Sequence, residues 1–252
     1  MRRSLLHPPL MHLLRSLFSA ALLRNLPAKL LPGCCALCGA NHSSLLREPC
    51  LSGHITKHHI RCIRCAIDMT TLHAQCGRCQ ADPPAFDATF TVASYAPPID
   101  QLVLALKFRG QLAYAAAFAN LLLREVPSEA VNGAGLIIAV PLSVERLAQR
   151  GFNQAHEMAK PLARAWQLPL ATHVCLRVRD TEAQSALALD RRQDNMRGAF
   201  AVARREAVAG QHVLVVDDVM TTGHTLNALA ACLKRHGATR VTNLVFARTP
   251  LR

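Results

Sequence analysis

Val213-Leu-Val-Val-Asp-Asp-Val-Met-Thr-Thr-Gly-His-Thr225 is the stretch that decides the fold of this chain. Its apolar residues 213–216 are β-formers and predict a buried central strand of a parallel sheet. Asp217 and Asp218 follow at the carboxyl end of that strand, which is the edge where open α/β sheets bind their ligands. Two carboxylates at this place can accept hydrogen bonds from sugar hydroxyls or organise Mg²⁺.

A phosphate site is predicted immediately after the two aspartates. The residues there are small or polar, and several carry hydroxyl groups: Thr221, Thr222, Gly223, His224 and Thr225. Apolar residues then recur at helical spacing across residues 226–236, so the main-chain N–H groups of the 221–225 loop lie at the positive end of a helix, which attracts phosphate. The alternative interpretation is a plain strand, turn and helix with two solvated aspartates. The coincidence of all three features in one short stretch favours the ligand site.

A second buried strand is predicted at residues 136–140, since this apolar run ends at Pro141, which cannot donate a ladder hydrogen bond. Arg146 and Arg150 follow it, four residues apart. On a helix, both guanidinium groups would point to one side, where they can clamp a dianion. A solvated basic helix face explains the pair nearly as well, but neighbouring amide side chains favour a binding surface. Lys107, which follows another apolar run, is open to the same two interpretations.

Two other nucleotide-binding patterns are excluded. Gly133-Ala-Gly135 precedes a predicted strand instead of following one, so it is not a dinucleotide fingerprint. The chain also contains no Walker loop.

A metal site is predicted from four closely spaced cysteines. Cys62 and Cys65 form one CxxC pair, and Cys76 and Cys79 form a second pair after ten intervening residues. Each CxxC turn presents two sulfur atoms to one ion, and four thiolates are the ligand set of a structural zinc ribbon. A redox-active CxxC is the alternative, but the sequence around it lacks the βαβ pattern of thioredoxin-like proteins.

A second, less regular cysteine cluster lies upstream. Cys35 and Cys38 form a CxxC pair, Cys50 follows after eleven residues, and His54 is close to the position where a fourth cysteine is expected. Two hypotheses remain open, namely a Cys₃His zinc site and a degraded first ribbon without metal, with Cys34 as a substitute for a neighbour. Two further cysteines, Cys175 and Cys232, lie in apolar surroundings and are predicted to be packing residues.

The chain is basic and begins with a Leu-rich segment. Its 252 residues carry a formal net charge of +13, which favours polyanionic partners, while aromatic residues make up only 4% and give little support for base stacking. Residues 1–31 are predicted to form an amphipathic helix that packs on the body or touches a membrane surface. Charged residues interrupt its apolar run, so we expect no transmembrane segment. A signal peptide is the alternative, but reduced thiol ligands favour the cytoplasm.

The stretch around the two aspartates resembles the phosphoribosyl pyrophosphate (PRPP) motif of type I phosphoribosyltransferases. Further segments narrow the resemblance to the ComF family, in the same order and at similar spacing. They are Leu106-Lys-Phe108, Val140-Pro-Leu142, Arg146, Arg150-Gly-Phe-Asn-Gln154, Arg179-Asp-Thr181, Gln184, Leu187, Arg192, Asn195 and Gly198-Ala-Phe200. The chain departs from its relatives at Ser143 and Glu145, where they usually carry a His and an Arg, and at Ala139, which replaces a common Pro.

The resemblance implies a doubly wound parallel α/β sheet of the type I phosphoribosyltransferase kind, with a small N-terminal zinc-ribbon module. Together with the patterns described above, it predicts three parts of the chain, namely the N-terminal helix (1–31), the zinc-ribbon module with a degraded first half (32–84) and a phosphoribosyltransferase-like domain (85–252). It assigns Asp217 and Asp218 to the ribose hydroxyls of PRPP and the 221–225 loop to the 5′-phosphate.

Two functions follow from the resemblance. One is a phosphoribosyltransferase that binds PRPP with Mg²⁺ and whose acceptor the sequence does not name. The other is a non-catalytic protein that binds single-stranded DNA, since the ComF family is associated with DNA uptake and natural transformation. Other competence proteins are expected partners in either case.

Overall fold

A computed structural model describes residues 33–55, 60–70, 74–178 and 198–250 of the chain. It contains two compact units, Met1–Arg47 and Glu48–Arg252. In the first unit, an isolated antiparallel bridge joins Cys34 and Asn41, and Ala36 N donates to Leu45 O at 2.8 Å. The predicted N-terminal helix lies outside the described residues, and the three predicted domain boundaries stay a prediction.

The second unit contains all of the named helices and strands. In chain order they are α2 (Glu48–Ser52), α3 (Gly77–Ala81), β1 (Ala88–Ser94), α4 (Ile99–Arg109), α5 (Ala113–Glu125), α6 (Ser128–Val131), β2 (Ala134–Ala139), α7 (Val144–Arg150), α8 (Gln154–Trp166), β3 (Cys175–Arg177), β4 (Phe200–Val202), η2 (Arg205–Ala207), β5 (His212–Met220), α10 (His224–Arg235) and β6 (Arg240–Arg248). Across the part of the chain that the structure describes, no helix has the length and apolar character that membrane crossing requires.

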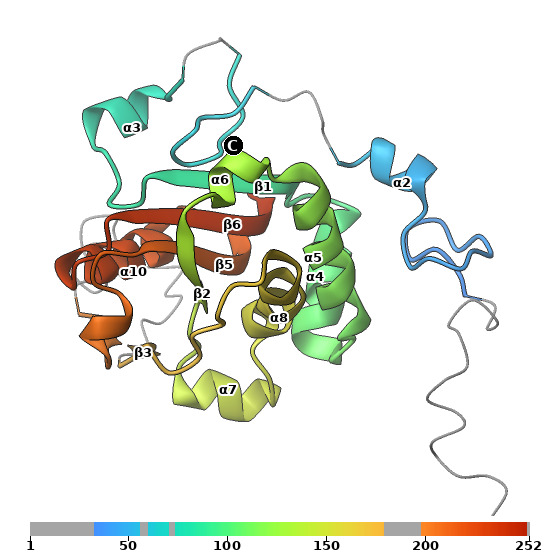
Figure 1. Ribbon diagram of the computed structural model, residues 1–252. Helices are drawn as coiled ribbons and strands as arrows, with labels where there is room; N and C mark the ends of the chain where they lie inside the picture. The colour runs from blue at the N-terminus through green and yellow to red at the C-terminus, as the bar shows by residue number, and fades with distance from the viewer. Residues whose placement is uncertain (1–32, 56–59, 71–73, 179–197, 251–252) are drawn as a thin grey trace, which may run out of the picture. The chain divides into compact units, whose positions relative to one another are not determined.

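A four-stranded parallel sheet forms the centre of this unit, in the order β1-β6-β5-β2 (Figure 1). The apolar residues 213–216 of β5 are buried, as a strand with neighbours on both sides and helices on both faces requires. This arrangement confirms the predicted parallel α/β fold. One detail differs, because β5 continues through the two aspartates to Met220, which pairs with Arg248 of β6.

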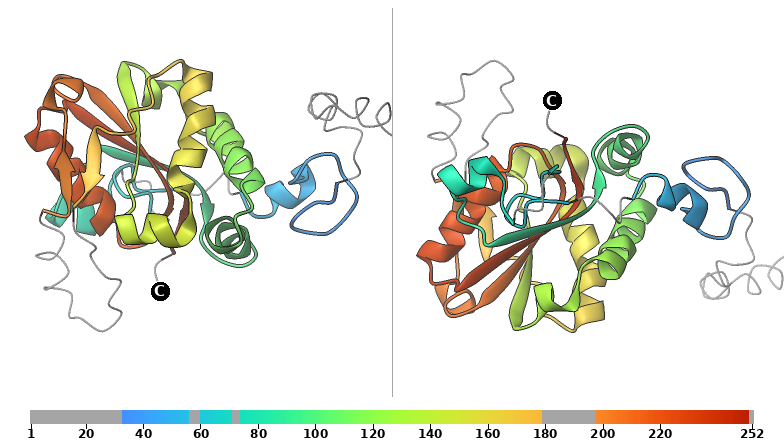
Figure 2. Two further views of the ribbon diagram at one scale, coloured as in Figure 1. Left: turned by 90° about the horizontal axis from the view of Figure 1, so that it is seen from below. Right: turned by 90° about the horizontal axis from the view of Figure 1, so that it is seen from above.

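Helices cover both faces of the sheet. On one face lie α4, α5 and α8, and on the other lie α10 and the antiparallel pair of β3 and β4 (Figure 2). Phe118 of α5 stacks on Phe246 of β6 with 3.6 Å between ring centroids, which fixes α5 against the sheet. Cys175 and Cys232 are buried in the core on the α10 side, as predicted for packing residues.

The segment that carries the paired cysteines, residues 60–70 and 74–82, is called the ribbon here. It lies against the outer edge of β1. Thr89 N donates to Ile63 O at 3.0 Å, and Arg61 Nη1 donates to Thr91 O at 3.0 Å. The ribbon is therefore attached to the sheet by main-chain hydrogen-bonding groups that an edge strand would otherwise leave unpaired.

Candidate functional site

The two aspartates lie near the carboxyl end of β5. Asp218 is 2% exposed, and Lys107 of α4 places its Nζ 2.9 Å from Asp218 Oδ2. Each carboxylate also accepts a hydrogen bond from the main-chain N–H of the next residue, at 2.9 Å in both cases. The structure thus brings together Lys107 and the acid pair, which are more than a hundred residues apart in the sequence.

Burial makes one of these carboxyl groups unusually basic. The pKa of Asp217 is raised well above its ordinary value, first by desolvation and then by the adjacent charge of Asp218, while Lys107 opposes the rise. A carboxyl group in this state is a strong acceptor for a hydroxyl group or a cation, since either partner would replace the water that it has lost.

The 221–225 loop needs its glycine for its backbone conformation. Gly223 has φ of 85° and precedes α10 as its N-cap, and a Cβ atom there would also require the Met220 Cε methyl to shift. A side chain at this position would therefore strain the backbone. The glycine allows the chain to turn from β5 directly into α10, so the 221–225 loop lies at the N-terminal end of that helix, where anions bind favourably.

The arginine pair lies on α7, which directly follows β2. Ser143 caps this helix by accepting from Arg146 N at 3.3 Å, so the serine that departs from the family pattern has a structural role. The guanidinium group of Arg150 lies over the Phe108 ring, with its Cζ 5.4 Å from the ring centroid. Its pKa is lowered mainly by desolvation and also by Arg146, whereas the charge of Asp218 raises it. Phe108 follows Lys107 on α4, so the ring contact brings Arg150 next to the helix that pairs with Asp218.

The loop after α7 is fixed to the end of β2. Asn153 Nδ2 donates to Val140 O at 3.0 Å, while its Oδ1 accepts from two N–H groups at the start of α8. Asn153, in the loop between α7 and α8, therefore connects the end of β2 to the start of α8.

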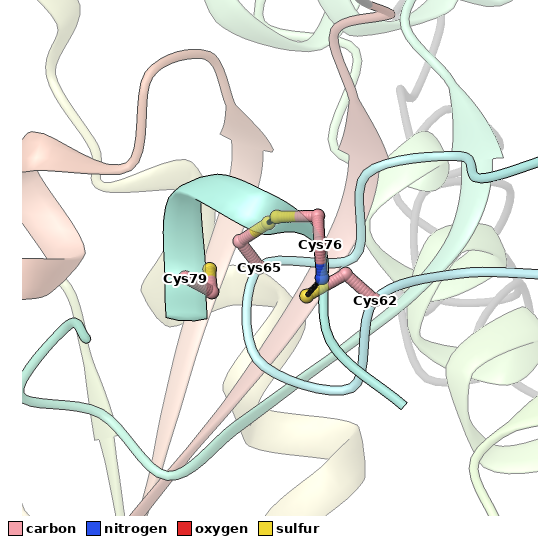
Figure 3. A group of neighbouring side chains, drawn as sticks. All are labelled: Cys62, Cys65, Cys76 and Cys79. Carbon is pink, nitrogen blue, oxygen red and sulfur yellow. Dashed lines mark hydrogen bonds between the residues drawn. The ribbon is translucent and has the colours of Figure 1, made fainter. Parts of the chain in front are cut away.

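The four ribbon cysteines converge from two turns of the chain (Figure 3). The sulfur atoms of Cys62, Cys65, Cys76 and Cys79 all lie within 4.8 Å of one another. Cys76 N donates to Cys62 Sγ at 3.3 Å, a contact that stabilises a thiolate. Four sulfur ligands in two knuckles fit a tetrahedral zinc ion.

The acidity of these thiols fits the same conclusion. Burial acts to raise the pKa of Cys62, but main-chain N–H groups that donate to its sulfur outweigh that effect and lower the pKa to about 7. Burial raises the pKa of Cys65 to about 11, and the charge of Cys62 adds to the rise. Cys79 is raised as well, by burial and by its sulfur neighbours. A divalent cation would take the place of the thiol protons, and its charge would offset the repulsion between the resulting thiolates.

The upstream cysteines are divided between the two compact units. Cys35 and Cys38 belong to the first unit, whereas Cys50 on α2 and the exposed His54 belong to the second. Burial acts to raise the pKa of Cys35, but main-chain N–H groups of Arg47 and nearby residues lower it to about 6. The Cys₃His set stays a prediction.

Arg248 and the cavity beside it carry no motif that predicts them from the sequence. Arg248 ends β6 and is 8% exposed, and a lone arginine at the end of an apolar strand was the signal available. It lines a cavity of about 530 Å³ between the ribbon and α10, together with Arg78, Phe86, His224 and Arg235. The motif residues 179–195 lie outside the described part of the chain.

Comparisons with known proteins agree with this architecture. Residues 147–251 match the family model described as "Phosphoribosyl transferase domain". The chain is 35% identical over 232 residues to "DNA utilization protein YhgH" of Escherichia coli (strain K12), which covers 86% of this chain and 98% of that protein.

Two competence proteins are also similar. "Competence protein F" of Haemophilus influenzae is 29% identical over 185 residues, covering 71% of this chain and 81% of the relative. "Competence protein ComFC" of Bacillus subtilis is 25% identical over 177 residues, covering 66% of this chain and 69% of the relative. With its parallel sheet, its cysteine ribbon and these relatives, the chain belongs to the ComF family of phosphoribosyltransferase-type proteins.

Proposed function

We propose that the protein binds PRPP together with Mg²⁺ at the carboxyl edge of its sheet. The observation that carries this proposal is the ion pair of Lys107 with an acid pair that runs directly into a glycine-dependent loop and the start of α10. Arg150 lies over the ring of Phe108, the residue next to Lys107. Anion-binding and hydroxyl-binding groups then lie next to each other, as a sugar phosphate requires.

Each residue has a role that its position suggests. Asp217 and Asp218 accept hydrogen bonds from the ribose hydroxyls, and the N–H groups of the 221–225 loop bind the 5′-phosphate. Lys107, Arg146 and Arg150 face the pyrophosphate and stabilise negative charge as it develops there. Mg²⁺, when bound, would supply further neutralisation of the pyrophosphate oxygens.

The reaction class that follows is phosphoribosyl transfer to an acceptor that remains to be identified. Positioning and electrostatics would provide most of the catalysis, since the chemistry at the anomeric carbon needs charge stabilisation more than a strong nucleophile. A protein that binds PRPP without turnover would use the same residues.

Isothermal calorimetry with PRPP and Mg²⁺ tests the proposal. We expect Asp217→Asn/Asp218→Asn to weaken binding by about 100-fold or more, because each hydrogen bond to a charged group contributes about 1.5–3 kcal/mol. Glu129→Gln, an exposed change on α6, is the matched control and should bind as the wild type does. Equal affinity in the double variant and the wild type would refute the assignment.

A second function, binding of single-stranded DNA, is favoured by the net charge of +13 and by relatives named for DNA utilization and competence. Other competence proteins are proposed partners on the same grounds. We also propose a cytoplasmic location and a structural zinc ion in the ribbon, because thiol ligands stay reduced in that compartment.

A further inference from the structure

Arg248 connects the cysteine ribbon to the loop that follows β5. Its Nε donates to Cys65 O at 3.0 Å, and its Nη1 donates to Met220 O at 3.1 Å, to Thr221 O and to Thr249 O at 2.9 Å. A buried guanidinium group needs partners for its N–H donors, so these carbonyl groups are held at fixed positions relative to one another.

A second contact joins the ribbon to the far end of the same loop. Arg78 lies on α3 between two of the metal-ligand cysteines, and its Nη2 is 3.5 Å from Nε2 of His224, the first residue of α10. Just after the ribbon, Ala85 N donates to Asn227 Oδ1 at 2.7 Å. The 221–225 loop therefore touches the ribbon region at both of its ends.

The position of the Cys65 carbonyl depends on the fold of the first knuckle. Ala66 N donates to Cys62 O at 2.8 Å, and Cys62 N donates to Ile67 O at 2.9 Å. Ala66 has φ of 54°, a conformation that a residue with a side chain adopts only when its surroundings impose it. Within the described residues, the core of the ribbon contains little besides the cysteines, Ile67 and Met69. A metal ion on the four sulfurs would therefore restrain this knuckle in addition to its hydrogen bonds to β1 and to Arg248.

We propose that the metal ion in the ribbon sets the conformation of the 221–225 loop, and thereby its affinity for PRPP, with Arg248 as the positioning residue. The inference about PRPP rests on the function proposed above. Linkage makes the effect reciprocal: if the metal strengthens PRPP binding, PRPP strengthens metal binding by the same factor.

Hydrogen exchange measures the loop without any need for PRPP. In the zinc-loaded wild-type protein, removal of the metal by a chelator should speed exchange at the amides of residues 221–225 by about fivefold or more, the lower end of typical coupling. Amides of β2, which lacks contacts with the ribbon among the described hydrogen bonds, should keep their rates and serve as the internal control. Unchanged exchange in the loop would overturn the proposal.

Zinc competition supplies the second measurement. A chromogenic chelator competes for the zinc with and without PRPP and Mg²⁺, and we expect PRPP to raise the apparent zinc affinity of the wild type about fivefold or more. Arg248→Met keeps the aliphatic part of the side chain but cannot bridge the carbonyl groups. In this variant, PRPP should therefore raise the apparent zinc affinity by less than about twofold. The comparison between variants is needed because PRPP itself binds divalent ions. An equal gain in Arg248→Met would overturn the role of Arg248.

Two further arms separate the possible failures. If calorimetry shows no PRPP binding to the wild type, the proposed function fails, and the hydrogen-exchange result alone decides whether metal and loop are linked. If Arg248→Met does not fold, Arg78→Ala takes its place, since Arg78 is exposed and its side chain makes the contact with His224. In Arg78→Ala, we expect the PRPP-dependent rise in apparent zinc affinity to be smaller than in the wild type. Arg164→Ala, a change on the exposed side of α8, is the control. If the rise is reduced no more in Arg78→Ala than in Arg164→Ala, the result counts against the proposal.

Discussion

Asp217 lies in a strand of mostly apolar residues, where its carboxyl group loses water and faces the charge of Asp218. Its pKa is therefore higher in the folded chain than in the unfolded chain. Between the ordinary pKa of an aspartate and this raised value, the folded chain binds more protons than the unfolded chain does. The free energy of unfolding consequently decreases as the pH rises through that window.

Asp217→Asn should therefore stabilise the folded protein at neutral pH, by about 0.5–2 kcal/mol, the range of single stabilising substitutions. The gain should disappear in acid below the ordinary aspartate pKa, where both forms of the wild type are protonated. Thermal unfolding across this pH range measures the effect, with Glu129→Gln as the control. A gain that is the same at every pH would show that the charge of Asp217 is not its source.

Local chemistry made the acid pair and the glycine predictable, because their neighbours in sequence are also their neighbours in space. Arg248 was missed for the opposite reason. Its hydrogen bonds reach Cys65, which is 183 positions away, and Thr221, which is 27 positions away. No spacing rule connects such positions, so only the folded chain shows them together.

The ribbon is an element too small to be stable through its own apolar residues. Its described core consists of Cys62, Ile67 and Cys79, with Cys65, Met69 and Cys76 packed against them. We therefore expect its folding to be coupled to metal binding.

Metal analysis of the purified protein should find one tightly bound zinc ion that is lost in Cys62→Ser/Cys65→Ser. Cys175→Ala/Cys232→Ala removes the same number of thiols from the core and should keep the zinc, because both residues lie outside the ribbon. Unchanged zinc content in the ribbon variant would favour the redox interpretation of the CxxC pairs.

Strong periodicity made the main elements predictable, including the strand at residues 136–140 and the helix after the 221–225 loop. The end of β5 was placed too early, since polar side chains at Asp217 and Asp218 suggested that pairing had stopped. Main-chain pairing with residues 245–248 of β6 continues regardless of the polarity of those side chains. The short antiparallel pair of β3 and β4 has three residues in each strand, too few to give a periodic signal.

The whole molecule is strongly basic, and this property gives a prediction about nucleic acids. We expect binding of single-stranded DNA with little sequence preference, because phosphate contacts carry affinity without reading bases. The affinity should decrease by about 0.7 log units per decade of salt for each phosphate neutralised. Fluorescence anisotropy on random and homopolymer strands, titrated with salt, provides the measurement.

Charge reversal on the ribbon would localise this binding. Arg64→Glu/Arg78→Glu should reduce both the affinity and the slope of its salt dependence, while Arg164→Glu on α8 serves as the matched control. Affinity that does not change with salt, or an absence of binding at low salt, would mean that the net charge of +13 serves solubility alone.

The overall architecture was predictable because a parallel α/β sheet and a cysteine ribbon each have their own sequence pattern. Their packing was not, since Thr89 N of β1 donates to Ile63 O and the Arg61 side chain donates to Thr91 O, and the β1 groups in both bonds are main-chain groups that every sequence contains.

That packing has a consequence for aggregation. β1 is an edge strand whose main-chain groups could pair with a strand from another chain if they were bare, and the ribbon bonds to two of them, Thr89 N and Thr91 O. On the opposite edge, Ile137 of β2 exchanges hydrogen bonds with Pro169 and Ala171, which protects that side in the same way. A truncated chain that begins at β1 would retain the residues proposed to bind PRPP but would expose the main-chain groups at the outer edge of β1. The ribbon therefore also covers an edge at which an uncovered strand could pair with another molecule.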